Sequence, residues 1–254
     1  MSEAERQGGI AERITSSLNS LTRARDRIPL QWAKRVNIGL VVAYLIWETW
    51  RCLRPDHHTI TSLAQLMRVE IRLDLITVGM VSLLLWIVRE RPRDLGFQRE
   101  RIGKQLLVGL GAGLLILVAD TILASTLTTL FPYGHAEGAG GLAALFKNPW
   151  NLPVLLLSGV VGGGGVEELT RVFILTRFRN TWGRAGLIIG ILIEATVFGL
   201  GHLYQGWIGA VSGAFTGLLF ALVWLRKGRI VEAMSAHACE DVVGLSIGFA
   251  MGHL

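Results

Sequence analysis

Five ionisable side chains that can carry acid–base chemistry lie within apolar stretches of this chain. Glu167 and Glu168 are adjacent and directly follow a run of glycines. His202 and His237 lie in two later apolar stretches, and Asp241 comes one helical turn after His237. A charged or polar side chain in hydrocarbon is costly, so such residues mark a functional site by default. Because Glu and His carry general acid–base chemistry and bind transition metals, we expect a site that activates water or holds a metal.

The spacing around the two glutamates predicts different roles for them. Glu168 and Arg171 are three residues apart, so they share a helical face and can pair. Glu167 then points about 100° away from Glu168. One glutamate can therefore face a cavity while its neighbour holds the arginine. The alternative is that both glutamates pair with basic groups such as Arg171 or Arg177.

The histidines each have a companion four residues away. Phe198 and His202 share one helical face, and His237 and Asp241 share another. An acidic group beside a histidine can fix its tautomer and orientation, and Glu240 is an alternative partner for His237. His202 lies near the end of its apolar stretch, where a polar tip at the membrane interface is the alternative interpretation.

A metal is an open alternative for this site. Glu167, His202 and His237 have the ligand types of a catalytic zinc centre, but the His-Glu-x-x-His spacing of zinc proteases is absent. The sequence therefore slightly favours water activation without a divalent metal. Cys52 and Cys239 are the two cysteines, and their placement fits neither a disulfide framework nor a zinc knuckle.

The composition predicts a polytopic membrane protein. The 254 residues are 51% hydrophobic and only 17% charged, whereas soluble domains carry about 25% charged residues. A spanning helix needs about 20 apolar residues, and seven segments approach that length, so we expect an all-α transmembrane helical bundle with about seven spans (six to eight). The predicted spans are approximately residues 36–50, 72–88, 102–131, 150–178, 184–203, 206–225 and 230–252.

Glycines in two of these spans predict close helix packing. Gly162 to Gly165 interrupt the fourth predicted span, and Gly209, Gly213 and Gly217 recur every four residues in the sixth. Such positions loosen a helix or let another backbone approach closely. We expect the glycines of the sixth span to serve packing rather than chemistry.

Basic residues predict the topology and the surface partners. Residues 1–35 form a charged N-terminal arm with apolar residues at helical spacing, which predicts a helix on the membrane surface, with a solvated tail as the alternative. Residues 36–254 form the bundle. The positive-inside rule places the N-terminus in the cytoplasm of a multi-pass inner- or plasma-membrane protein, although loop 51–72 departs from it with four arginines. The net charge of +6 points to membrane lipids rather than nucleic acid.

Taken together, the polar segments resemble the intramembrane proteases of the CPBP family. This family includes CAAX prenyl endopeptidases and bacteriocin-processing, abortive-infection and immunity-associated relatives. Its pattern is Glu-Glu-x-x-x-Arg, then Phe/Tyr-x-x-x-His, then His-x-x-x-Asn or Asp. Phe198 to His202 and His237 to Asp241 match the second and third motifs in order.

The resemblance covers about residues 93–245 and includes one departure. Residues 93–97, Arg-Asp-Leu-Gly-Phe, are similar to a stretch that often precedes the family core. The first motif here, Glu167-Glu-Leu-Thr-Arg171, is one residue shorter than usual, and Asp241 replaces the commoner Asn. An ionised Asp cannot donate a hydrogen bond, which weakens an oxyanion-stabilising role at that position.

The resemblance implies hydrolysis of a peptide bond of a protein or peptide at the membrane. Glu167 and His202 would activate a water, and His237 and Asp241 would stabilise the oxyanion or complete the site. Two rival interpretations are a transporter that uses the polar cluster for ions or protons, and a degenerate relative that binds peptides without cutting them. The residues that the resemblance assigns to support are Glu168, Arg171 and Phe198.

Overall fold

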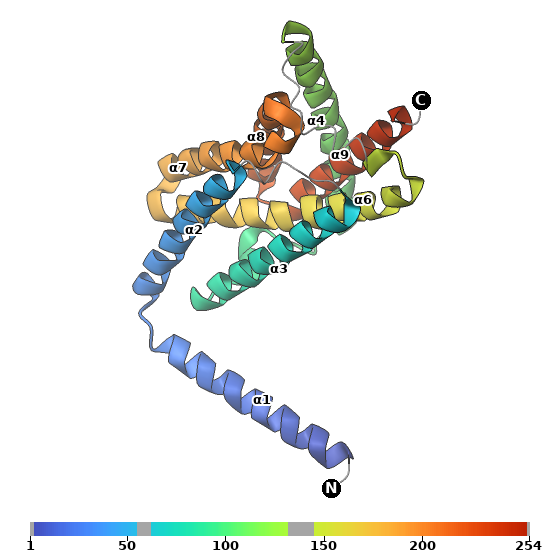
Figure 1. Cartoon of the computed structure of the whole chain (residues 1–254). Helices are drawn as coiled ribbons and strands as arrows, with labels where there is room; N and C mark the ends of the chain where they lie inside the picture. The colour runs from blue at the N-terminus through green and yellow to red at the C-terminus, as the bar shows by residue number, and fades with distance from the viewer. Residues whose placement is uncertain (1–2, 55–61, 132–144, 253–254) are drawn as a thin grey trace.

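The computed structural model of the chain describes residues 3–54, 62–131 and 145–252 (Figure 1). Within these ranges every regular element is helical and none is a strand. The predicted all-α class is therefore confirmed. The main elements in chain order are α1 (Glu3–Asp26), α2 (Leu30–Cys52), α3 (Leu63–Ile87), α4 (Ile102–Leu130), α6 (Leu152–Ser158), a π-helical segment (Gly159–Glu167), α7 (Glu168–Gly201), α8 (Gly206–Lys227) and α9 (Ile230–Met251).

Three stretches are long and apolar enough to cross a membrane by length and composition. These are Ile102–Leu130, Pro149–Gly201 and Leu203–Lys227 among the described residues. The predicted spans at 36–50, 72–88 and 230–252 also form helices, but these helices do not reach the same apolar length. The sequence thus predicted these three helices, and their crossing of a membrane stays a prediction.

The N-terminal arm folds as the long helix α1, which extends away from the other helices (Figure 1). Its C-terminal end is tied to the bundle by Arg89, whose Nη2 donates hydrogen bonds to the backbone oxygens of Arg25, Asp26 and Ile28 at 3.2 to 3.3 Å. A basic side chain at this end satisfies carbonyls that have no partner within the helix. Contact of α1 with a lipid surface stays a prediction.

Helix α7 folds back on itself at Trp182 and Gly183, where the backbone leaves helical geometry. Gly183 has φ +62°, a conformation that a side chain with a Cβ rarely adopts. The second half of α7 then packs on the first, because a Cβ at Gly190 would lie 2.9 Å from Cβ of Phe178. The predicted break between the fourth and fifth spans falls at this hairpin.

The first half of α7 is the centre of the molecule. Its residues from Thr170 to Phe178 are all buried. Its apolar residues join one core with side chains of α2, α3, α8 and α9. Burial on every side is typical of a central helix of a bundle. Charged groups on this segment must therefore find partners inside the protein.

The glycine run in the π-helical segment lets α9 approach closely. A Cβ at Gly164 would lie 2.6 Å from Cβ of Ala238 and 2.8 Å from the backbone oxygen of Met234. Such distances are too short for real side-chain contacts, so only glycine fits here. The close approach places the face of α9 that carries His237 next to Glu167.

The glycines of α8 pack against Phe198 and His202, the two residues of the second family motif. A Cβ at Gly213 would lie 3.0 Å from Cγ of His202, and one at Gly217 would lie 3.0 Å from Cδ1 of Phe198. The packing role predicted for these glycines is thus confirmed. Their absent side chains leave the room that the rings of Phe198 and His202 occupy.

We expect Gly164→Ala to lower the stability of the protein in detergent by about 1–3 kcal/mol, because the added methyl overpacks the contact with α9. Gly165→Ala is the matched control, since a Cβ there would meet only the Val160 oxygen at an ordinary 3.6 Å. Alanine favours a helix over glycine by about 1 kcal/mol. Apparent melting temperatures measure both changes, and equal values for the two variants would contradict the packing argument.

Candidate active site

A cluster of buried ion pairs is centred on Arg171. Arg171 is fully buried, and its Nε donates to both carboxylate oxygens of Glu194 at 2.9 and 3.0 Å. Its Nη1 pairs with Glu168, which is also fully buried. The guanidinium lies over the ring of Phe198, 4.5 Å from its centroid. A buried cation is thus matched by two carboxylates and an aromatic face.

The predicted pair of Glu168 and Arg171 forms, and Glu194 is a second partner that sequence reasoning did not assign. Arg177 pairs with Glu90 instead of with either glutamate of the motif. The sequence feature that singles out Glu194 is its position as an acidic residue within an apolar stretch. Its partner could not be read from spacing, because the two residues are 23 positions apart and meet only through the α7 hairpin.

Glu168 also fixes the ring of His237. Nδ1 of His237 lies 2.9 Å from Oε1 of Glu168, and the ring stacks on Phe220 at 4.3 Å with an interplanar angle of 16°. An ionised carboxylate can only accept a hydrogen bond, so Nδ1 carries the proton and donates it. In neutral His237 the lone pair is therefore on Nε2.

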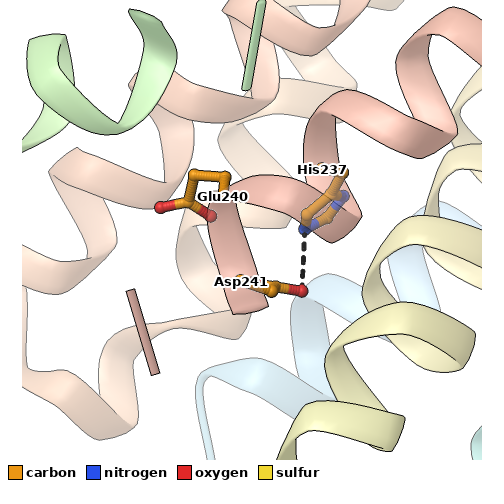
Figure 2. Close-up of side chains that lie close together, drawn as sticks. All are labelled: His237, Glu240 and Asp241. Carbon is orange, nitrogen blue, oxygen red and sulfur yellow. Dashed lines mark ion pairs between the residues drawn. The ribbon is translucent and has the colours of Figure 1, made fainter. Parts of the chain in front are cut away.

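Nε2 of His237 faces two further carboxylates. Oε2 of Glu167 and Oδ2 of Asp241 each lie 3.6 Å from it, and the line to Asp241 is drawn in Figure 2. The side chain of Glu167 is 46% exposed, whereas that of Glu168 is fully buried. Three acceptor atoms thus converge, and such a group suits a water that donates protons or a cation.

His202 presents a second imidazole with a defined orientation. Its Nδ1 lies 2.8 Å from the backbone oxygen of Phe198, which can only accept, so Nδ1 donates and Nε2 is free. The ring packs against Phe198 at 4.7 Å and stacks near Tyr204 at 6.0 Å. Both histidines are therefore oriented by a bond at Nδ1, which is the usual way a protein selects a tautomer.

Glu167 and His202 line the same cavity, which has a volume of about 230 Å³ and lies between α2, α3 and α7. Its walls are mainly apolar and aromatic, and several further carboxylates line it. Glu48 pairs with Arg51, and Glu70 accepts a hydrogen bond from Ser158. A mostly apolar cavity with a few converging polar groups is the usual form of a substrate site.

Residues 148–243 match the family described as Type II CAAX prenyl endopeptidase Rce1-like. This stretch, which is less than half of the chain, is similar to that family of CAAX-type membrane proteases and contains every site residue predicted from the sequence. No curated protein and no solved structure matches the chain.

The structure brings together a different set of metal-ligand types from the one that the sequence suggested for zinc. His237, Glu240 and Asp241 offer ligand atoms within 4.8 Å of one another and form the one such group among the described residues (Figure 2). The predicted set of Glu167, His202 and His237 is not brought within that distance. The reason is that His202 is anchored to its own helix at Phe198, while Glu240 and Asp241 lie on α9 beside His237.

The resemblance also paired Glu167 with His202, whereas the imidazole within 4 Å of Glu167 belongs to His237. The two glutamates do separate as the helical spacing predicted, with Glu167 in the cavity and Glu168 in the buried cluster. One chain supplies all these groups, and the oligomeric state, which the sequence left unknown, is untested.

We expect Arg171→Leu to destabilise the protein by about 3–5 kcal/mol, because it leaves two buried carboxylates without their cation. Arg184→Leu, an exposed change of the same kind, should stay within about 0.5 kcal/mol. Adding Glu168→Gln and Glu194→Gln to Arg171→Leu should recover part of the loss. Thermal unfolding in detergent measures the series, and an unchanged midpoint for Arg171→Leu would contradict the role of the cluster.

Proposed function

We propose that the protein is a membrane endopeptidase that hydrolyses a peptide bond of a protein or peptide with water activated by Glu167. The observation that carries this proposal is the contrast between the two adjacent glutamates. Glu168 is buried in the ion-pair cluster, whereas Glu167 is half-exposed in the cavity and lies 3.6 Å from Nε2 of His237. The Rce1-like match supports peptide hydrolysis as the reaction.

The first step is the attack of water on the peptide carbonyl. A water beside Glu167 and His237 can donate one hydrogen to Oε2 and the other to Nε2, which orients its lone pair towards the substrate. Glu167 takes the proton as the oxygen bonds to the carbonyl carbon, and the carbonyl π electrons move to oxygen. Neither a serine nor a cysteine nucleophile is needed.

The second step is collapse of the tetrahedral intermediate. The C–N bond breaks, and the proton held by Glu167 passes to the departing amine. His202 lines the same cavity, and its Nε2 can accept a hydrogen bond from the hydroxyl of the intermediate, because Nδ1 carries the proton. Glu168 keeps His237 in the required tautomer. The products are an amine and a carboxylic acid, which loses its remaining proton to water.

Asp241 and Glu240 are two further carboxylates beside His237 on α9. Together the three residues fit a divalent cation in ligand type and mutual distance. Such a cation would supply Lewis acidity and a bound hydroxide. We favour the version without it, because Oε2 of Glu167 and Nε2 of His237 offer two acceptors to one water, and Asp241 is as well placed to orient that water as to bind a metal.

Glu167→Gln should lower cleavage by about 10²–10⁴-fold, because Gln cannot accept the proton of the attacking water. The melting temperature should stay unchanged, since Glu167 makes no buried ion pair. Glu100→Gln, an exposed change of the same type, is the control. Mass spectrometry of peptides incubated with purified protein measures cleavage, with farnesylated and unmodified C-terminal Cys-aliphatic-aliphatic-X peptides and a mixed peptide library as substrates. Full activity of Glu167→Gln would refute the assignment.

Metal dependence is tested by elemental analysis and chelation of the same preparation. We expect less than stoichiometric zinc and cleavage that survives chelator. If about one zinc per chain is lost together with activity, the metal-free version is wrong. In that case Glu240→Gln should also lower the bound zinc, because Glu240 is one of the three clustered ligands and lies outside the sequence-predicted set.

A further inference from the structure

A second pocket has a lining opposite in charge to that of the cavity that Glu167 and His202 line. It has a volume of about 500 Å³, and its basic lining consists of Arg91, Arg93 and Arg99. No carboxylate lines it, and the apolar part of its wall comes from Phe97, Ile102 and Val231. We propose that this pocket binds the headgroup of an anionic phospholipid whose acyl chain lies along α4.

The arginines of the pocket are available for an anion. Among the described residues no carboxylate lies within ion-pair distance of Arg91 or Arg99, and Arg93 approaches Asp94 only at 4.0 Å. All three side chains belong to exposed residues. Guanidinium groups match phosphate oxygens in charge and in hydrogen-bond geometry. The unused positive charge therefore favours a phosphate-bearing ligand.

The loop that carries these arginines is held in place. Gln105 is fully buried, and its Nε2 donates to the backbone oxygens of Gln98 and Glu100 at 2.9 Å. The backbone N–H of Ile230 donates to the oxygen of Gly96 at 3.3 Å, which ties the loop to the start of α9. A pocket fixed before binding loses less entropy when its ligand arrives.

The N-terminus of α4 adds to the attraction for an anion. Ile102, its first residue, lines the pocket, and the preceding Arg101 makes no side-chain capping bond. No acidic residue lies in the first turn. Free N–H groups and the positive end of the helix dipole favour a phosphate at this position.

The surface directly beyond the pocket selects a lipid over a soluble phosphate. α4 is one of the candidate membrane spans, so its first turn lies at a membrane interface. From Ile102 an unpartnered apolar row descends at four-residue spacing, with each residue 43–51% exposed. A charged pocket continuous with such a row complements a charged headgroup joined to an acyl chain. The row consists of Ile102, Leu106, Leu110 and Leu114.

Native mass spectrometry of the detergent-solubilised protein tests the proposal with phosphatidylglycerol, phosphatidylcholine and glycerol phosphate as probes. We expect phosphatidylglycerol to bind in preference to the other two. The triple variant Arg91→Gln/Arg93→Gln/Arg99→Gln should weaken its binding by about fivefold per arginine removed. Leu106→Ser/Leu110→Ser should also weaken phosphatidylglycerol but leave glycerol phosphate unaffected.

The matched control removes the same charge elsewhere, at exposed positions outside the pocket lining: Arg27→Gln/Arg184→Gln/Lys227→Gln. The proposal is wrong if this control loses as much affinity as the pocket variant, because binding would then follow net charge alone. It is also wrong if glycerol phosphate binds as tightly as the lipid, because the site would then recognise a free anion. Since the readout is lipid binding, either result is independent of whether the protein cleaves peptides.

Discussion

The pairing of one buried guanidinium with two buried carboxylates is the interaction on which the site depends. Arg171 joins the two halves of α7 through Glu168 and Glu194, and Glu168 in turn holds Nδ1 of His237 on α9. Each of these groups would be costly if it were buried alone. The same contacts that satisfy the buried charges therefore set the direction in which His237 presents Nε2. One cluster of side chains thus stabilises the fold and orients a residue of the proposed site.

Close backbone approach is the second constraint. The glycines beside Glu167 bring α9 against the π-helical segment, and those of α8 leave room for the rings of the second motif. A π-helical stretch is frequent at functional sites because it changes which face the following side chains present. Here it ends at Glu167, directly before the regular helix that buries Glu168. Glu167 and Glu168 then point about 100° apart and enter different environments.

Local sequence patterns predicted the helices and the separation of Glu167 from Glu168. Hydrophobic period and residue spacing determine which side chains share a face within a few helical turns. These patterns could not predict that Glu194 pairs with Arg171. In a straight helix 23 residues would place Glu194 about 35 Å from Arg171, and only the reversal at Gly183 brings them together. Spacing also could not show which ligand types lie together. The contact of His202 with Phe198 follows from their four-residue spacing, but the distance of His202 from α9 depends on how the helices pack.

The reversal at Gly183 also bears on how the chain enters a bilayer. The stretch Pro149–Gly201 has 53 residues, more than twice the length that one crossing needs. Its first arm carries Glu167, Glu168 and Arg171, and each charge near the centre of an inserting helix costs about 2.5–3.5 kcal/mol. That arm alone is a poor candidate for release into lipid by the translocon. The second arm brings the carboxylate of Glu194 to the arginine, so biogenesis favours entry of both arms together as a helical hairpin.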